Sequence, residues 1–574
     1  MGEEMFGPGS PFEVVVEKVA FEGSNLPHHK GQEYKVFKNM MQTLTDLYEM
    51  PIAKGYGPKE FLVYDDERLT YNQVFQQAGQ LGHVLVDKFG VQNGDRVCIV
   101  SRNCPEYLIA FIAATSIGAV AVRMNSWWTT KELEYGLENS GSRVVFCDQD
   151  RLKHMLPILD SLKDLCGVVL MRGGNTDQHE KIQSFDQVVE LGSGFSMPAN
   201  SATKDDNAVL MYTSGTTGHP KGVVMTHRGI THALNAVAVH HIVQRGSNEK
   251  SAKKGSLEKS IMLTVPLFHA TGLHMIFLVS IMVCRKIVMM YKWDPEKALQ
   301  LIERERVTQF TGVPTMVLEM MQCPNFNQYD TSSLEGVGGG GAPPPPSIVG
   351  QIGTKFKRAS AGQGYGATET NAVLCVIASQ DYAARPKSCG KPLPTVELEI
   401  WDENGTKLPP NIPGRVMARG ANIMKEYWRK PEATKKAITA NGFYETGDVG
   451  QLDDEGFLYI LGRNKLDMVI RGGENISSAE VEGVIFSIKG VAEASVFGIP
   501  HPTLGEEVAV AIFQDPEYAG EITLRYIQNA CRDILANFKI PTRLFIWPTR
   551  LPRGATGKTL KRAIKEQVMK TSKL

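Results

Sequence analysis

Short apolar runs alternate with helical patterns through most of this 574-residue chain, and the alternation limits the folds that it can adopt. Each run is five or six residues long and precedes a polar or helical stretch, as expected of strands covered on both faces. The runs lie at residues 96–100, 143–147, 208–213, 261–266 and 286–290. This pattern predicts an α/β fold in which parallel sheets carry helices on both sides.

One helix is marked at its start as well as along its length. Asp294 is a typical N-cap and Pro295 follows at the first helical position, so a helix is predicted over residues 294–307. Its apolar residues lie mainly on one face: Ala298, Leu299, Leu301, Ile302 and Val307. Two uncharged stretches, 107–122 and 273–284, are shorter than the ~20 residues of a membrane-spanning helix and predict buried helices.

The pattern changes from about residue 396, where strands are separated by glycine and proline turns. An antiparallel or barrel-like segment is expected there, with strands at 396–401 and 415–418. After Gly462 a smaller α/β unit is predicted, with strands at 466–470, 493–497 and 507–513 and helices at 479–486 and 524–536. Because 574 residues are too many for one ordinary core, we predict two domains, 1–462 and 463–574.

The charges of the chain balance, with 62 basic and 62 acidic side chains. Such a chain has no electrostatic footprint for nucleic acid or for an anionic membrane surface, so small-molecule chemistry is favoured. The nine cysteines are scattered and never form a CxxC pair. This spacing indicates reduced thiols of an intracellular protein and predicts no zinc site.

The most informative local feature is the segment YTSGTTGHPKG at residues 212–222, directly after a predicted strand. Its glycines let backbone N–H groups turn toward an anion, its Ser and Thr hydroxyls donate hydrogen bonds, and Lys221 adds a mobile positive charge. A flexible surface loop would need neither the buried strand nor the lysine. The segment therefore predicts a triphosphate-binding loop.

Three other nucleotide signatures are weaker. The 212–222 loop is not a P-loop, because Pro220 precedes Lys221 and Gly222 follows it. A second P-loop-like run at 554–559 has Pro552 where the first glycine belongs. Gly362-x-Gly364-x-x-Ala367 loosely matches a dinucleotide fingerprint, but a poor strand precedes it and a poor helix start follows it, which disfavours an oxidoreductase.

Five stretches fall in order along the chain, and together they resemble the adenylate-forming superfamily of acyl-CoA synthetases, adenylation domains and beetle luciferases. They are YTSGTTGHPKG (212–222), GYGATET (364–370), YETGD (444–448), GRNKLDMVIRGGENI (462–476) and LPRGATGKTLKRAI (551–564). The resemblance covers nearly the whole chain. It implies a large N-terminal domain of doubly wound sheets plus a distorted β-barrel, a small mobile α+β C-terminal lid, and a hinge near residues 463–467.

The resemblance also implies an ATP site. The triphosphate loop would comprise Thr213, Ser214, Gly215, Thr216, Thr217, Gly218 and Lys221. The adenine pocket would comprise Gly339, Gly340, Gly341, Ala342, Pro343, Gly364, Tyr365 and Gly366, with Tyr365 stacking on the base. Thr368 would contact the α-phosphate, Glu369 would hold Mg²⁺, and Asp448 and Arg463 would bind the ribose.

The remaining implied roles concern the acid, the lid and coenzyme A. His269 resembles the histidine that borders the acyl site, and Lys558 would stabilise negative charge while a carboxylate attacks the α-phosphorus of ATP. Lys465 would be the hinge pivot, although Asp467 lies four residues after Arg463 where the superfamily usually has three. Gly472 and Gly473 would line the path of the pantetheine arm.

The resemblance favours a ligase for medium- or long-chain fatty acids, because Ile470 stands where aryl ligases and luciferases carry a lysine. The alternatives are an aryl (coumarate-like) CoA ligase, a luciferase-like adenylating monooxygenase, an adenylation domain that serves a carrier protein, and a catalytically inactive lipid-binding relative. Light emission with luciferin would identify the monooxygenase, and absence of ATP–pyrophosphate exchange would identify the inactive relative.

The last three residues, Ser572-Lys573-Leu574, match the peroxisomal import signal. We therefore expect the protein in the peroxisomal matrix, carried there by the import receptor.

Overall fold

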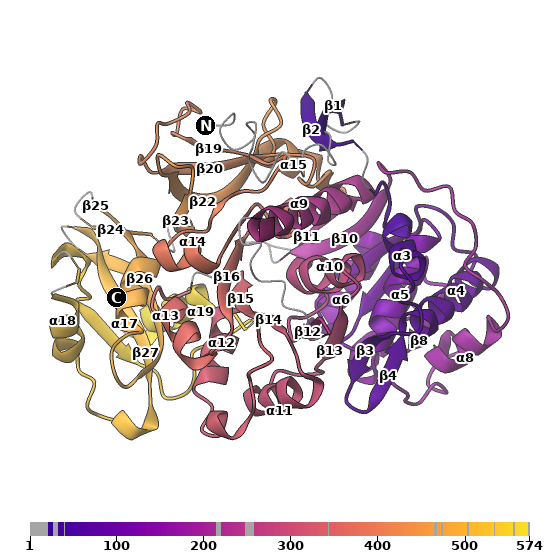
Figure 1. Cartoon of the computed structure of the whole chain (residues 1–574), viewed down its shortest axis with the longest axis horizontal. Helices are drawn as coiled ribbons and strands as arrows, with labels where there is room; N and C mark the ends of the chain where they lie inside the picture. Colours follow the sequence, from indigo (N-terminus) through magenta and orange to yellow (C-terminus); the bar gives the residue numbers. More distant parts are fainter. Residues whose placement is uncertain are drawn as a thin grey trace.

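The computed structural model describes residues 21–26, 32–38, 41–213, 220–246, 258–341, 344–463, 468–471, 474–501, 504–532, 534–535, 537–554 and 557–571. Two large mixed sheets and three smaller ones hold the strands of these segments (Figure 1). The α/β class predicted from the alternation is confirmed.

The first large sheet has eight strands in the order β21-β11-β10-β6-β5-β7-β8-β9. Their bounds are β5 (Arg96–Val100), β6 (Val120–Arg123), β7 (Ser142–Cys147), β8 (Gly167–Leu170), β9 (Ile182–Ser184), β10 (Asn207–Thr213), β11 (Lys221–Thr226) and β21 (Glu426–Tyr427). The strands from β10 to β9 in this order are parallel, whereas β11 and β21 are each antiparallel to their neighbours.

The second large sheet has nine strands in the order β18-β17-β16-β15-β14-β12-β13-β3-β4. Their bounds are β3 (Glu60–Tyr64), β4 (Glu67–Thr70), β12 (Ser260–Leu263), β13 (Lys286–Met289), β14 (Gln309–Gly312), β15 (Gly336–Gly340), β16 (Ser360–Tyr365), β17 (Cys375–Ala378) and β18 (Lys391–Pro392). The six strands from β16 to β3 are parallel. All five predicted strands are present, and β12 ends three residues before its predicted limit.

A layer of helices fills the space between the two sheets. It contains α3 (Leu44–Ala53), α4 (Tyr71–Asp87), α5 (Pro105–Ser116), α8 (Phe185–Leu191), α9 (His227–Gly246), a π-helix (Thr271–Leu278) and α10 (Val279–Met282). Their side chains and the inner faces of both sheets form one core, in which the rings of Phe111 and Phe277 meet edge to face at 6.1 Å. Every residue of α5 except Glu106 is buried, as expected of a helix that is apolar all round.

The prediction of one buried helix over residues 107–122 is wrong in its second half. The chain turns at Gly118, whose φ of +79° suits glycine, so α5 ends at Ser116 and β6 begins at Val120. The other uncharged stretch, 273–284, is helical and mostly buried as far as Met282, in the π-helix and α10, and ends in a turn at which Val283 is exposed.

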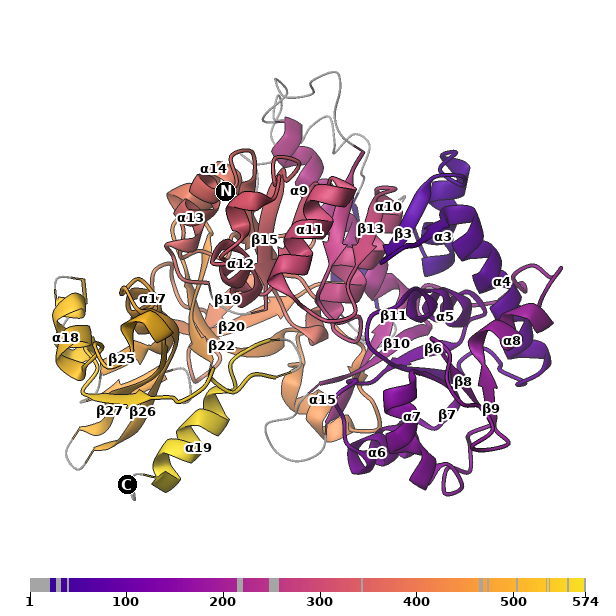
Figure 2. The same ribbon diagram turned by 90° about the horizontal axis from the view of Figure 1, so that it is seen from below.

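Two outer helical layers complete the large part of the molecule (Figure 2). One contains α11 (Pro295–Glu305), α12 (Pro314–Met321), α13 (Ile348–Lys355) and α14 (Ser379–Ala384), and the other α6 (Thr130–Ser140) and α7 (Gln149–Met155). The predicted cap of α11 is confirmed, since the Asp294 side chain accepts from the Lys297 N–H at 2.8 Å. This helix ends two residues early, where Arg306 adopts a left-handed conformation.

The expected barrel is not formed. Strands β19 (Glu397–Trp401), β20 (Gly414–Arg419), β22 (Tyr444–Leu452) and β23 (Leu458–Arg463) make an open antiparallel sheet in that order. Four strands are about half the number that encloses even a side-chain-filled barrel, so the sheet has two edges. Helix α15 (Pro431–Ala437) lies before β22, and β1 (Phe21–Asn25) pairs with β2 (Glu33–Phe37) near the beginning of the chain.

The C-terminal part has its own sheet, built from β24 (Met468–Arg471), β25 (Glu474–Ser477), β26 (Val491–His501), β27 (Gly505–Gln514) and β28 (Arg543–Ile546). Helices α17 (Ser478–Ile485), α18 (Leu524–Arg532) and α19 (Lys561–Thr571) accompany it. Among the described residues, no hydrophobic core cluster combines side chains from before residue 461 with side chains from after residue 468. The position of the boundary, 462/463, stays a prediction.

No helix within the described segments is long and apolar enough to span a bilayer.

The central helical layer gives the first prediction. Phe277→Ala should lower the free energy of unfolding by about 3–5 kcal/mol, because it leaves a cavity against Phe61 and Phe111. Urea denaturation monitored by circular dichroism measures the change. Leu191→Ala on α8, where the side chain is 55% exposed, is the control and should shift stability far less. Equal losses would show that the layer does not carry the core.

Candidate active site

A β-hairpin presents the predicted triphosphate loop. Strands β10 and β11 pair antiparallel with Thr213 opposite Lys221, and the Thr213 hydroxyl donates to the Lys221 carbonyl at 3.3 Å. The two strand ends therefore hold the loop between them at a fixed width. Its central residues lie outside the described segments: Ser214, Gly215, Thr216, Thr217 and Gly218.

Lys221 is linked to Glu369 through an aromatic residue that the sequence analysis did not select. The Lys221 ammonium lies 4.6 Å from the ring centroid of Tyr427, and the Tyr427 hydroxyl donates to the Glu369 carboxylate at 2.9 Å. Tyr427 lies on β21, the edge strand beside β11. Lys221, the predicted phosphate ligand, and Glu369, the predicted metal ligand, therefore both contact the buried Tyr427 side chain. Lys221 lies over its ring and Glu369 accepts from its hydroxyl.

Most residues of the predicted adenine pocket are glycines, but several of these glycines are also needed for the packing of neighbouring strands. A Cβ atom at Gly339 would lie 1.9 Å from the Gly312 carbonyl oxygen, and one at Gly340 would lie 2.7 Å from that of Gly364. These glycines therefore permit the close approach of β14, β15 and β16. Gly341 adopts a φ of +81° just after β15, and Gly366 lies close against the Ala372 backbone. Ala342 and Pro343 lie outside the described residues.

The predicted adenine and ribose residues come together. The Tyr365 hydroxyl, at the end of β16, donates to the Asp448 carboxylate at 2.6 Å. Burial, and then the Asp448 charge, raises the pKa of Tyr365, so the phenol keeps its proton. Arg463 is opposite Asp448 in the β22–β23 register. Thr368 opens a short 3₁₀ turn, Thr368–Thr370, that contains Glu369.

His269 lies before the π-helix, and burial, followed by the charges of Arg123 and Lys558, lowers its pKa to about 3. The ring is therefore neutral at physiological pH and supplies no positive charge to the site. Its Nε2 atom is buried and has no hydrogen-bond partner among the described residues.

Lys558 reaches the same region from the C-terminal part. A turn in which the Gly554 N–H donates to the Lys558 carbonyl at 2.8 Å carries this lysine. Its Cε atom lies 3.8 Å from where a Cβ of Gly341 would be, and Gly557 packs beside Val313. The small sheet therefore holds Lys558 against the glycine end of β15.

Ion pairs fasten this arrangement across the two parts. Glu319 on α12 accepts from both Arg550 and Arg553, the latter at 2.9 Å. The same arginines pair with Glu493 on β26 at 3.3 and 2.7 Å. Trp293 Nε1 donates to the other oxygen of Glu319 at 2.7 Å and so fixes the carboxylate. The sequence analysis missed this network.

The predicted hinge and coenzyme A residues cannot be placed. Lys465, Gly472 and Gly473 lie outside the described residues. On either side of the glycine pair, Arg471 and Glu474 are opposite each other in the antiparallel β24–β25 pair.

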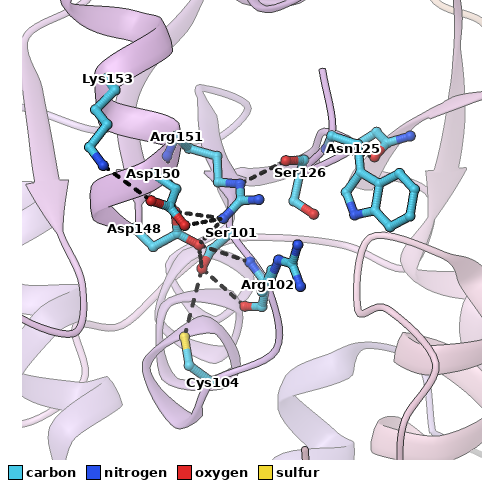
Figure 3. Close-up of polar contacts among 10 residues, drawn as sticks. Ser101, Arg102, Cys104, Asn125, Ser126, Asp148, Asp150, Arg151 and Lys153 are labelled. Carbon is cyan, nitrogen blue, oxygen red and sulfur yellow. Dashed lines mark hydrogen bonds and ion pairs between the residues drawn. The ribbon is translucent and has the colours of Figure 1, made fainter. Parts of the chain in front are cut away.

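A second polar cluster lies where β5, β6 and β7 end (Figure 3). The Asp148 carboxylate accepts from the Ser101 hydroxyl at 3.0 Å and the Arg102 N–H at 3.1 Å, and it pairs with Arg151 at 3.0 Å. Arg151 also donates to the Ser126 carbonyl at 2.7 Å. One carboxylate and one guanidinium thus tie together the loops that follow three neighbouring strands.

The donor set suits a metal that is held mainly by substrate. Within the described segments, no group of three or more His, Cys, Asp or Glu side chains is arranged to hold a metal ion. Mg²⁺ usually needs only one or two protein carboxylates when phosphate oxygens supply further ligands. Glu369, buried and beside Lys221 through Tyr427, fits that role for a nucleotide-bound Mg²⁺.

Comparison with known proteins agrees with this geometry. The family described as AMP-binding enzyme matches residues 52–428, and the family described as AMP-binding enzyme C-terminal domain matches residues 480–558. The long-chain-fatty-acid–CoA ligase FadD13 of Mycobacterium tuberculosis is 33% identical over 88% of this chain and 94% of its own.

Two further proteins show the range of the relatives. The 4-coumarate–CoA ligase 1 of Solanum tuberosum is 30% identical over 88% of this chain and 90% of its own. The crystal structure of the anthranilate CoA ligase AuaEII in complex with anthranoyl-AMP matches with a TM-score of 0.83 and 25% identity, over 93% of this chain and 98% of that one. The chain therefore belongs to the family of AMP-binding enzymes, and these relatives, which it resembles over most of its length, are acid–CoA ligases.

Proposed function

We propose that this ATP-dependent acid–CoA ligase acts on medium- or long-chain fatty acids. The observation that carries the ligase chemistry is the position of Lys558, which the small sheet holds against Gly341 and within electrostatic reach of His269. The 33% identity to a long-chain-fatty-acid–CoA ligase and the uncharged Ile470 support the aliphatic substrate.

Adenylation requires positive charge where two anions meet. The attacking carboxylate and the α-phosphate repel each other, and Lys221 and Lys558 would stabilise the negative charge that develops. Bound Mg²⁺ would add a further positive charge at Glu369. His269 stays neutral because its pKa is about 3, so it shapes the acid site without competing for the carboxylate.

The second half-reaction requires the thiol of coenzyme A to reach the acyl carbonyl. Lys558 and the Gly472-Gly473 pair both belong to the C-terminal part, so rotation of that part about residues 463–467 would replace one by the other. The closeness of Lys558 to Gly341 supports assigning the structure to the adenylating orientation.

An aryl-CoA ligase is the second candidate, favoured by the 30% identity to a 4-coumarate–CoA ligase and the fold match to an anthranilate CoA ligase. A panel of fatty acids of graded length and of cinnamic and benzoic acids, each with ATP and coenzyme A, distinguishes the two. Turnover confined to aromatic acids would contradict the fatty-acid proposal.

Removal of the Lys558 charge tests the role of this residue. Lys558→Ala should slow adenylation by about 10²- to 10³-fold, as expected for loss of one preorganised charge-stabilising donor. Thioester formation from pre-made acyl-AMP and coenzyme A should stay near the wild-type rate. Single-turnover assays of the two half-reactions measure both effects, with the exposed Lys570→Ala on α19 as the control. Equal losses in both half-reactions would refute the alternation of the lid.

The ion-pair network predicts a smaller loss of adenylation rate than the one expected for Lys558→Ala. Glu319→Gln removes the shared carboxylate charge that holds Arg550 and Arg553, and it should slow adenylation about 5-fold, because such partly exposed pairs contribute roughly 1 kcal/mol. The thioester step from pre-made acyl-AMP should be unchanged or faster. Glu180→Gln, an exposed acidic residue, should alter neither step. An unchanged adenylation rate in Glu319→Gln would show that the ion-pair network has no part in the mechanism.

We further propose that the protein resides in the peroxisomal matrix, on the basis of Ser572-Lys573-Leu574. Deletion of these three residues should leave ligase activity intact and the protein cytosolic, as fluorescence microscopy of a tagged chain would show. Continued import of the shortened chain would contradict the proposal.

A further inference from the structure

Arg123 is a buried cation for which the part of the chain that the structure describes supplies no counter-ion. It is the last residue of β6, it has no exposed surface, and its Nε donates to the Tyr107 hydroxyl at 3.1 Å. Its guanidinium lies 5.7 Å and 5.9 Å from the ring centroids of Tyr107 and Phe111 on α5. Neither terminal nitrogen has a hydrogen-bond partner among the described residues, and none of their carboxylates forms an ion pair with Arg123.

Such an arrangement is costly for an apoprotein. A guanidinium that is removed from water loses its hydration, and only a paired anion or a full set of acceptors compensates for the loss. Tyr107 does not neutralise it, because burial raises the pKa of the phenol. Two N–H groups of one planar fork therefore remain unused, in the geometry that binds one carboxylate with two parallel hydrogen bonds.

Other unused polar atoms surround the fork. The Arg123 charge contributes to the low pKa of both His269 and His274, so both rings lie within its electrostatic reach. Within the described segments, His269 Nε2 and both ring nitrogens of His274 are buried without a side-chain or backbone partner at hydrogen-bonding distance, as is the Asn371 side-chain oxygen. The Asn371 backbone is close enough to raise the pKa of His274 slightly. Neutral rings and one fixed cation thus form a polar region inside an otherwise apolar core.

This region adjoins the proposed reaction site. His269 is within reach of the charges of both Arg123 and Lys558, and Asn371 lies two residues after Glu369. The Arg151–Ser126 hydrogen bond fixes the loop after β6 (Figure 3). Arg123 is the last residue of that strand.

We propose that Arg123 binds a second carboxylate at the far end of the acid, so that the preferred substrates are α,ω-dicarboxylic acids rather than simple fatty acids. The inference rests on the proposed acid–CoA ligase function and narrows its substrate class. One carboxylate is activated near Lys558, and the other forms the bidentate pair that Arg123 lacks. Arg123 is thus a specificity-determining residue.

The test compares two series of acids that differ only at the far end. Saturated monocarboxylic acids and α,ω-dicarboxylic acids of equal length are assayed with ATP and coenzyme A, and kcat/KM is measured for each. The wild-type enzyme should prefer the dicarboxylic acid by at least about 10-fold at the best length. Arg123→Met should lower kcat/KM for that acid by ~10²-fold, as for loss of one partner of a buried charge pair, and should leave the monocarboxylic acids unchanged or improved.

Two variants control for structure and charge. Arg285→Met removes another buried arginine, whose nitrogens are already bonded to Ser280 and Gln309, and should leave the ratio between the two series unchanged. Arg123→Lys keeps the charge without the fork and should restore part of the preference. If Arg123→Met does not fold, the test is the rise in Tm of the wild-type enzyme when each acid binds. The dicarboxylic acid should raise Tm more than the monocarboxylic acid of the same length.

The outcomes separate this inference from the function on which it rests. Efficient turnover of monocarboxylic acids by the wild-type enzyme, without any preference for dicarboxylic acids, would overturn the role of Arg123 and leave the fatty-acid ligase intact. Equal loss of both series in a folded Arg123→Met enzyme would likewise overturn it. Turnover of neither series would contradict the proposed function, and the inference with it.

Discussion

The helical layer between the two large sheets is the constraint on which the site depends. Helix α5 and the π-helix consist mainly of apolar residues, and these residues are buried only when a sheet covers each face of the helix. That requirement fixes the distance and orientation of the sheets. In open α/β sheets, ligands bind outside the carboxyl ends of the strands. The ends of β10 and β16, at Thr213 and Tyr365, carry the predicted nucleotide residues in this molecule.

Local patterns predicted most strands and helices, because the spacing of apolar residues in each of them reflects which of its faces are buried. The Asp294 cap and the apolar runs of the two large sheets are examples. The barrel was a wrong prediction, since alternating strands and turns look alike in an open sheet and in a closed one. The split of residues 107–122 into a helix and a strand depended on a single glycine that the hydrophobic pattern conceals.

The candidate site was predicted only where a motif is contiguous. Tyr427 meets Glu369 across 58 positions, and Arg553 meets Glu319 across 234, so no local pattern marks either pair. No local pattern marks Arg123 as a binding residue either, because a single arginine after an apolar run is common in protein sequences. Only the folded core shows that its two terminal nitrogens have no hydrogen-bond partner among the described residues. The glycines of β15 were predicted correctly as bare backbone, but part of their role is the close approach of neighbouring strands.

The absence of a core cluster shared between the large part and the C-terminal part, among the described residues, has a thermodynamic consequence. Separation of surfaces joined by charges exposes little hydrocarbon to water, so the heat-capacity change of lid rotation should be small. The enthalpy of the rotation would then be nearly the same at all temperatures. Added salt would weaken the Glu319 pairs and so change the orientation equilibrium directly. In the proposed rotation, the two parts would therefore separate without presenting a large apolar surface to neighbouring molecules.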